Sequence, residues 1–147
     1  MIKKIIVAVL VSTISVSGFA ANHLIFSCTN NQGKKVEVKE VEQNIQYSFG
    51  RPGYPELVFK NSKTQVAKQT KENPPLNYHE QWIVLKNGEY TYMPRTYMYI
   101  ENPDKSGKIA TEAGVSVKRN DKEISSIICD KRKKDLYVNF DEDLSGY

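Results

Sequence analysis

Two cysteines are the residues whose chemistry the sequence constrains most. Cys28 and Cys129 lie near opposite ends of the chain, and neither has a histidine or a second cysteine at the spacing of a zinc site. An even pair of cysteines in an exported chain is typical of a disulfide. We therefore predict a bond between Cys28 and Cys129. The alternative is a lipid-anchored Cys28 that leaves Cys129 as a free thiol.

The two histidines offer little catalytic chemistry. His79 lies between a tyrosine and a glutamate in a segment with strand alternation, so its side chain is expected on the opposite face from both neighbours. If the mature chain begins at Ala21, its α-amine, the next two amides and the imidazole of His23 form a square-planar ligand set for Cu(II). Adventitious copper binding at Ala21, Asn22 and His23 is the only metal chemistry expected, and no cofactor is predicted.

Catalytic motifs are missing from the sequence. It contains no Gly-x-Ser-x-Gly elbow, no His-Glu-x-x-His helix and no phosphate-binding glycine loop. Acidic residues occur close together at Glu40 and Glu42 and at Asp141 and Asp143, but closeness in sequence does not establish the separation across a cleft that catalytic carboxylates need. We predict that the protein is not an enzyme.

Aromatic residues concentrate between residues 78 and 99. Tyr78 and Trp82 occur in one segment, and four tyrosines follow in the next. A row of rings on one face can stabilise cross-strand packing, whereas an exposed row would bind a protein or a sugar. Both interpretations remain open. With two residues of a nearby turn added, the candidate binding residues are Arg51, Tyr54, Trp82, Tyr90, Tyr92 and Tyr97.

The start of the chain predicts export. Lys3 and Lys4 precede an apolar run over residues 5–16, and small residues follow at Gly18 and Ala20, as in a secretory signal peptide. We expect residues 1–20 to be removed and residues 21–147 to form one domain, periplasmic or secreted and not membrane-spanning after cleavage. Loss of the two lysines lowers the formal net charge from +4 to +2, so nucleic acid is not an expected partner.

The remaining sequence alternates between apolar and polar residues with a period of two, the pattern of half-buried strands. We predict an all-β fold, an antiparallel barrel or sandwich of about eight strands. The alternation is clearest over residues 24–28, 36–38, 45–49, 57–59, 78–85, 90–99, 113–117 and 124–129.

Turn-forming residues separate these segments. Asn87 and Gly88 predict a tight hairpin turn, because the favoured turn needs positive φ at both central positions. Residues 119–122 predict a second hairpin turn. Pro94 has no N–H to donate, so its segment is expected to be an edge strand or to contain a bulge.

Two segments break the alternation. Residues 61–76 are polar and rich in lysine, and we expect a surface loop that is either mobile or functional. Leu136, Phe140 and Leu144 recur at a spacing of four, which predicts one or two helical turns at the end of the chain.

The layout resembles that of a known group of periplasmic proteins. After the leader, Phe26, Ser27 and Cys28 are followed by Gly33, by a segment with alternating valines and finally by a strand ending in Cys129. In this respect the chain is similar to the periplasmic C-type lysozyme inhibitors, and the resemblance implies an eight-stranded barrel that blocks an enzyme cleft with loop residues. Their Ser-Gly-x-x-Tyr type of inhibitory motif does not occur here, so no inhibitory residue carries over.

These observations lead to one functional expectation and one alternative. We expect a non-enzymatic binding protein of the bacterial envelope with a protein partner, such as a wall-degrading enzyme or toxin that it inhibits. The alternative is a module that binds carbohydrate or another envelope polymer through the tyrosine row.

Overall fold

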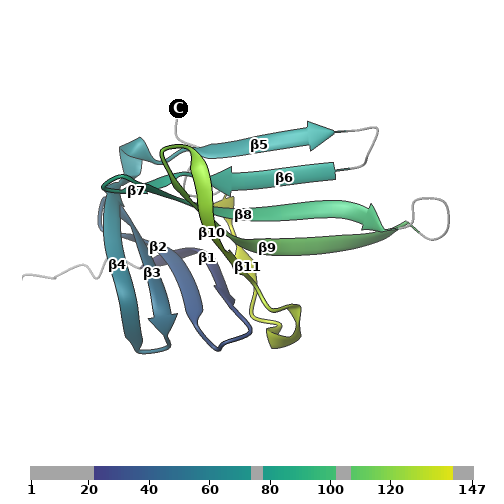
Figure 1. Cartoon of the computed structure of the whole chain (residues 1–147), viewed down its shortest axis with the longest axis horizontal. Helices are drawn as coiled ribbons and strands as arrows, with labels where there is room; N and C mark the ends of the chain where they lie inside the picture. The colour runs from purple at the N-terminus through teal and green to yellow at the C-terminus, as the bar shows by residue number, and fades with distance from the viewer. Residues whose placement is uncertain (1–21, 74–77, 102–106, 141–147) are drawn as a thin grey trace, which may run out of the picture.

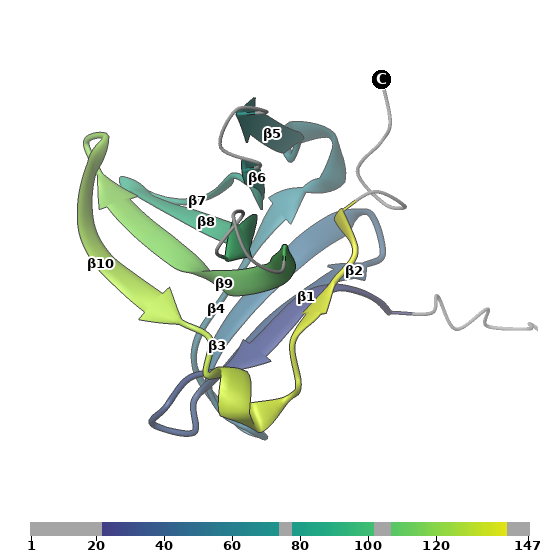
Figure 2. The ribbon, with the colours of Figure 1, turned by 90° about the vertical axis from the view of Figure 1, so that its right-hand side faces the viewer.

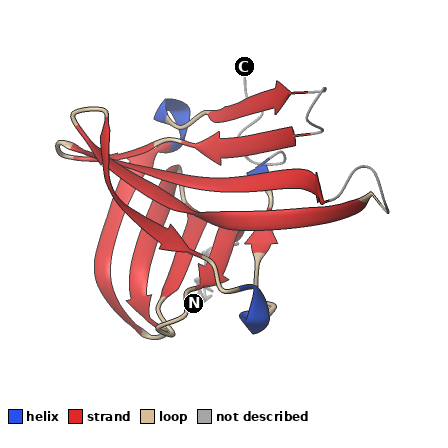
Figure 3. Ribbon diagram, turned by 45° about the vertical axis from the view of Figure 1, so that its right-hand side comes forward, coloured by secondary structure: helices blue, strands red, loops and turns tan. Residues whose placement is uncertain are grey.

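The fold is known from a computed structural model that describes residues 22–73, 78–101 and 107–140 (Figure 1). It is an all-β sandwich of two antiparallel sheets, as the sequence predicts, and the sheets do not close into a barrel. Eleven strands occur in the described residues, where about eight were expected. Figure 3 shows how completely strands dominate these residues.

Sheet A contains the amino-terminal strands and the last strand, in the order β11-β1-β2-β3-β4. Their bounds are β1 His23–Thr29, β2 Lys35–Val41, β3 Asn44–Arg51, β4 Tyr54–Ser62 and β11 Tyr137–Val138. Consecutive strands pair with their neighbours through short turns, and β11 returns to pair with β1.

Sheet B contains the central part of the chain, in the order β10-β9-β8-β6-β5, with β7 also paired to β8. Its strands are β5 Lys68–Asn73, β6 Tyr78–Ile83, β7 Leu85–Asn87, β8 Tyr90–Glu101, β9 Lys108–Arg119 and β10 Lys122–Ile128. Two 3-10 helices complete the described elements, η1 Lys63–Gln65 and η3 Lys131–Lys133. The strands of sheet B run steeply across those of sheet A, and one end of β5, β6, β8 and β9 extends beyond it (Figure 1).

The core lies where the two sheets face each other. Alternate residues point inward as the period-two pattern requires, so Val36 and Val38 of β2 are buried while their charged neighbours are partly exposed. An aromatic cluster crosses the interface: Tyr47 lies 5.0 Å from Phe59 and 5.2 Å from Tyr92, measured between ring centroids. This packing fixes which face of sheet B is turned toward sheet A.

Two links hold the sheets together. The predicted disulfide is confirmed: Cys28 of β1 is bonded to Cys129, directly after β10, with their Cα atoms 5.5 Å apart. On β4, the side-chain amide nitrogen of Asn61 donates to the carbonyl of Lys86 at 2.7 Å, and its oxygen accepts from the N–H of Lys86 at 2.7 Å. The Asn61 amide therefore pairs with β7 as a neighbouring strand would.

Hairpin turns were predicted at Asn87–Gly88 and at residues 119–122, and both occur, but the first has different central residues. The hairpin between β7 and β8 pairs Asn87 with Tyr90, so its central residues are Gly88 and Glu89. Only Gly88 has positive φ, at 59°, which is what a type II′ turn requires at its first central position. In the β9–β10 hairpin, Asn120 and Asp121 both have positive φ, 50° and 61°, as a type I′ turn requires.

The prediction for Pro94 was wrong. This residue is fully buried in β8, which has neighbours on both sides and pairs without a register shift with β9. The interruption lies in the opposite neighbour instead, because β6 ends at Ile83 and β7 begins at Leu85. A missing backbone donor is thus accommodated by a break in the adjacent strand at Val84 rather than by an edge or a bulge.

The loop predicted over residues 61–76 was also wrong in large part. Residues 61 and 62 belong to β4, η1 follows, and β5 pairs with β6 along its whole length. Val66, between η1 and β5, is buried as part of the core. β5 is an edge strand with polar residues on both faces, so its sequence lacks the apolar alternation by which a strand is recognised. Residues 74–76 lie outside the described part of the chain.

The helical turn expected between Leu136 and Phe140 does not form. Between them lies β11, which adds to the edge of β1, and Phe140 is buried with its ring centroid 6.0 Å from that of Phe26. Tyrosine and valine both favour strands, and the backbone pairing of Tyr137 and Val138 with β1 stabilises the extended conformation over a helix. Leu144 and the proposed leader lie outside the described residues. Within them, no helix has the length and apolar character needed to cross a membrane.

A tyrosine cleft as the candidate binding site

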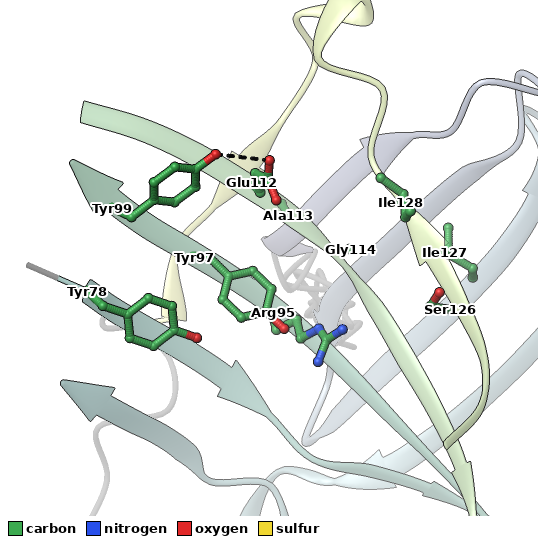
Figure 4. A pocket seen from close by; sticks show the side chains of 10 residues that line it. All are labelled: Tyr78, Arg95, Tyr97, Tyr99, Glu112, Ala113, Gly114, Ser126, Ile127 and Ile128. Carbon is green, nitrogen blue, oxygen red and sulfur yellow. Dashed lines mark hydrogen bonds between the residues drawn. The ribbon is translucent and has the colours of Figure 1, made fainter. Parts of the chain in front are cut away.

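A cleft of about 380 Å³ lies on the outer face of sheet B, the face turned away from sheet A. We call it the tyrosine cleft, because Tyr78 of β6 and Tyr97 and Tyr99 of β8 form one side (Figure 4). The end of β10 contributes Ile127 and Ile128 on the other side.

Strand register explains why these side chains meet. Tyr78 pairs with Tyr99, and Tyr97 pairs with Glu112 of β9. Residues that pair across antiparallel strands share a face, so the three rings and this carboxylate lie together. Tyr92 is separated from Tyr97 by an odd number of positions and therefore points to the opposite face, into the core.

Tyr78 and Tyr97 both lie beside the carboxylate of Glu80. The rings of Tyr78 and Tyr97 lie 6.0 Å apart and are tilted by 44°, and the Tyr78 hydroxyl donates to Glu80 Oε2 at 2.7 Å. Desolvation raises the pKa of Tyr78, and the hydrogen bond to Glu80 raises it further. Desolvation also raises the pKa of Tyr97, although Arg95 acts in the opposite direction. Both hydroxyls are therefore neutral at physiological pH.

Arg95 supplies a cation at the bottom of the tyrosine cleft. Its Cζ atom lies 5.0 Å from the centroid of the Tyr97 ring, in cation–π geometry, and its Nη2 lies 4.0 Å from Glu123 Oε2. Ser116, which is fully buried, donates its hydroxyl hydrogen to the same Glu123 oxygen. The guanidinium is thus held between a ring and a carboxylate that is itself held by a buried hydroxyl.

Tyr99 and Glu112 form the outer rim. The Tyr99 hydroxyl donates to Glu112 Oε1 at 3.2 Å, and Lys131 Nζ of η3 lies 3.3 Å from the same oxygen. Partial desolvation and this hydrogen bond raise the pKa of Tyr99. A ligand in the cleft would meet three aromatic faces together with both donors and acceptors at the rim.

Gly114 determines how closely β10 approaches the floor of the cleft. A Cβ atom at this position would lie 2.3 Å from the carbonyl oxygen of Ile127, a backbone atom that cannot rotate away. We expect Gly114→Ala to move the end of β10 and to lower the free energy of unfolding by about 1–3 kcal/mol. Urea denaturation monitored by circular dichroism checks this.

The matched control for that substitution is Thr111→Ala, an exposed position on the same strand, for which a change within about 0.5 kcal/mol is expected. Equal unfolding midpoints for Gly114→Ala and the wild type would contradict the steric role of Gly114.

A second hollow, of about 660 Å³, lies beside the disulfide. It is bounded by the β1–β2 turn, Phe49, the end of β10 and η3. Asp130 caps η3 by accepting from the N–H of Arg132 at 3.0 Å and from its guanidinium at 2.8 Å. These hydrogen bonds lower the pKa of Asp130 to about 2.

We expect NMR titration to give Asp130 a pKa of about 2 and to show it rising toward 3.8 in Arg132→Gln. Because the folded-state pKa is depressed, the stabilisation is present above the unfolded-state pKa and is lost as the pH falls toward 2. The wild type should therefore lose more stability than Arg132→Gln between pH 4 and pH 2. Identical Asp130 titrations in the two proteins would contradict this assignment.

The six candidate residues from the sequence lie in different places. Of these six, Tyr97 lines the tyrosine cleft. Trp82 pairs with Arg95 and so lies beside the cleft on the same face. Tyr92 packs in the core, and Tyr90 lies 5.7 Å from the Arg119 guanidinium.

Arg51 and Tyr54 are paired at the β3–β4 hairpin, where Arg51 borders a third hollow of about 200 Å³ on sheet A. The Tyr54 side chain is 80% exposed. Neither residue contributes to the tyrosine cleft.

The histidines are also separated from the cleft. His79 pairs with Met98, which places it on the opposite face of sheet B from Tyr78. His23 begins β1 opposite Glu40, while Ala21 lies outside the described residues, so the copper ligand set stays a prediction. In the described part of the chain, no group of three or more His, Cys, Asp or Glu side chains is placed to hold a metal ion.

Tyr78 and Tyr99 belong to the aromatic row that the sequence analysis considered, but they were not among its six candidates, and Arg95 and Glu112 were missed altogether. One signal was available: Arg95, Tyr97 and Tyr99 alternate with Thr96 and Met98, so they share a face. Glu112 could not be found this way, because its position depends on the register between β8 and β9.

Comparisons with protein-family models, with curated proteins and with solved structures gave no match to this chain, so the tyrosine cleft is interpreted from its own geometry.

Proposed function

We propose that this protein is an exported, non-enzymatic binding protein of the bacterial envelope that holds a partner protein on the outer face of sheet B. The observation that carries the proposal is the tyrosine cleft, which no part of the described chain fills. Its principal side chains are three tyrosines and an arginine, residue types that dominate the energetics of protein interfaces. The partner class we propose is a wall-degrading enzyme or toxin, which binding would inhibit.

Binding without chemistry is supported by the way the polar groups of the cleft are engaged. Glu80 accepts from Tyr78, and Glu112 accepts from Tyr99 while lying beside Lys131. Each carboxylate thus orients a neutral phenol, which presents the ring to a ligand. Such fixed rings lose little conformational entropy on binding, as an interface anchor requires.

Export is supported by two independent features. The Cys28–Cys129 disulfide is stable in oxidising compartments, and residues 1–20 have the composition of a secretory leader. A periplasmic or secreted location is the proposal that accounts for both.

The test is affinity capture from an envelope fraction of the producing bacterium, with immobilised mature protein and two variants. Tyr97→Ala removes the central ring of the cleft, and Tyr54→Ala removes an exposed tyrosine away from it. We expect one partner to be recovered equally by the wild type and Tyr54→Ala, and at least tenfold less by Tyr97→Ala. Equal recovery by all three proteins, or none above background, would contradict the proposal.

Carbohydrate binding is the second candidate, and the cleft geometry gives it specific support. Tilted rings 6.0 Å apart, with carboxylates and a guanidinium at their edges, can stack on a sugar ring and bind its hydroxyls. Trp82, the single tryptophan, lies beside Arg95 and reports on this site by fluorescence. A saturable change on titration with soluble peptidoglycan fragments, absent in Tyr97→Ala, would favour a sugar over a protein.

A further inference from the structure

The guanidinium of Arg95 has hydrogen-bonding capacity that the described residues do not use. It stacks on the Tyr97 ring, but the carboxylate oxygen that it approaches, Glu123 Oε2, is 4.0 Å from Nη2, which is too long for a hydrogen bond. No hydrogen bond joins this guanidinium to another residue of the described chain. The Arg95 side chain is 25% exposed, so its five N–H donors are only partly open to solvent.

Glu112 on the neighbouring strand β9 has a carboxylate oxygen without a donor. Tyr99 and Lys131 both approach Oε1, at 3.2 Å and 3.3 Å, and no described residue donates to Oε2. Because Arg95 pairs with Gly114, two positions along β9 from Glu112, the two charged residues are diagonal neighbours, about 7–8 Å apart between Cα atoms. One ligand can therefore use the donors of the guanidinium and the acceptor of the carboxylate together.

An apolar wall faces the guanidinium across the cleft. Arg95 and Ile128 both pair with Gly114, so they lie on the same face of sheet B with no side chain of β9 between them (Figure 4). Ile128 is 74% exposed, and covering it would be favourable by the hydrophobic effect. β10 lies at the margin of sheet B, with no drawn strand beyond it (Figure 2). A ligand seated against Ile128 has room to continue past this margin.

We propose that the tyrosine cleft binds the carboxyl-terminal residue of a partner protein. The α-carboxylate of that residue accepts from the Arg95 guanidinium, and its N–H donates to Glu112 Oε2. An aliphatic side chain on the same residue packs against Ile128. This inference rests on the proposed function, because it states which part of the partner the cleft holds.

The arrangement of donors and acceptors favours a chain terminus over other anionic groups. A terminal residue carries a carboxylate and an N–H on the same Cα atom, and a guanidinium binds a carboxylate through two parallel hydrogen bonds. A glutamate side chain separates its carboxylate from its own N–H by two further carbon atoms. A phosphate has no N–H to donate, and its greater negative charge would be repelled by Glu112 and Glu123.

Titration of the ¹⁵N-labelled mature protein with short peptides, followed by NMR, tests the role of the carboxylate. The probe is N-acetyl-Ala-Ala-Leu with a free carboxylate, and its matched control is the same peptide with a carboxyl-terminal amide. We expect the acid to shift the resonances of residues that line the cleft and the amide to bind at least tenfold more weakly. This comparison needs no protein variant, so it does not depend on whether a variant folds.

Arg95→Gln identifies the group that meets the carboxylate. In this variant the acid and the amide should bind with dissociation constants within about twofold of each other, because amidation no longer removes an ion pair. Arg119→Gln is the matched control: this arginine also lies over a tyrosine ring, that of Tyr90, but it does not line the cleft, and the preference for the acid should persist. Circular dichroism establishes that each variant is folded.

Methylation of the leucine nitrogen in the peptide acid tests the second contact. The methylated peptide has no N–H for Glu112 Oε2, so it should bind the wild type several-fold more weakly than the unmethylated acid. In Glu112→Ala the two peptides should bind equally well, because the acceptor is already missing.

Four outcomes would overturn the proposal. They are no binding of the peptide acid, equal binding of acid and amide to the wild type, a preference for the acid that persists in Arg95→Gln, and equal binding of an amidated peptide whose last residue is glutamate. Recovery of a partner that depends on Tyr97, together with any of these outcomes, would contradict this inference alone. Carboxylate-dependent peptide binding without recovery of a partner would contradict the proposed function instead.

Discussion

Replacing both Cys28 and Cys129 by alanine is expected to lower the free energy of unfolding by about 4–5 kcal/mol. The bond connects residues 101 positions apart, and the chain-entropy model gives this magnitude for closure of so long a loop. Domains of this size have total stabilities of about 5–15 kcal/mol, so the loss would take a large share of the total. Urea denaturation followed by Trp82 fluorescence and far-ultraviolet circular dichroism measures the effect.

The wild type reduced with dithiothreitol is the control for that measurement, because it opens the same loop without changing the side-chain volume. Both proteins should unfold at a similar, lower urea concentration than the oxidised wild type. Unfolding of the double variant at the wild-type midpoint would show that the link between β1 and the end of β10 contributes nothing to stability.

Phe140→Ala should have the second largest effect on stability, a loss of about 3–5 kcal/mol. The ring of Phe140 is buried and nearly parallel to that of Phe26, with an interplanar angle of 6°. Its removal leaves a cavity beside β1 and releases the segment that holds β11. Thermal and urea denaturation of the variant measure the loss.

Tyr137→Ala is the matched control for Phe140→Ala. This aromatic residue lies three positions earlier, but its side chain is exposed, so we expect a loss of less than about 1 kcal/mol. Similar losses for the two variants would indicate that pairing of β11, rather than burial of the Phe140 ring, holds this end of the chain.

The alternation of apolar and polar residues predicted most strands correctly, because each sheet buries one face in the core and exposes the other. In β2, Val36 and Val38 point into the core and the intervening Glu37 does not, so the sequence carries the pattern directly. Turn-forming residues predicted the β7–β8 and β9–β10 hairpins, since glycine, asparagine and aspartate accept positive φ.

The sequence predictions failed where the outcome depends on which strand pairs with which, because apolar alternation within one segment does not show its neighbour in the sheet. β5 is an edge strand without an apolar face, so its sequence is indistinguishable from that of a surface loop. Pro94 was misinterpreted because its missing donor is accommodated by the gap between β6 and β7, a feature of the neighbouring strands. Leu136 and Phe140 have helical spacing, but the strand between them pairs with β1.

The candidate site was predictable only within a single strand. The positions of Arg95, Tyr97 and Tyr99 already separate them from Tyr90 and Tyr92 by face. The carboxylate of Glu112 and the wall formed by β10 are brought to the cleft by register between strands, which one sequence does not encode locally.

The pairing of β1 with β11 has a consequence for the order in which sheet A is completed. The pairs from β1 to β4 join neighbours in the sequence, whereas β11 and the covalent partner of Cys28 come from the other end of the chain, the latter 101 positions later. Contacts this distant in sequence cost more loop-closure entropy than local ones and are slow to form. Sheet A therefore gains its last strand and its covalent bond late, so a chain synthesised from its amino terminus exposes the β11-facing edge of β1 until nearly all of its residues have been made.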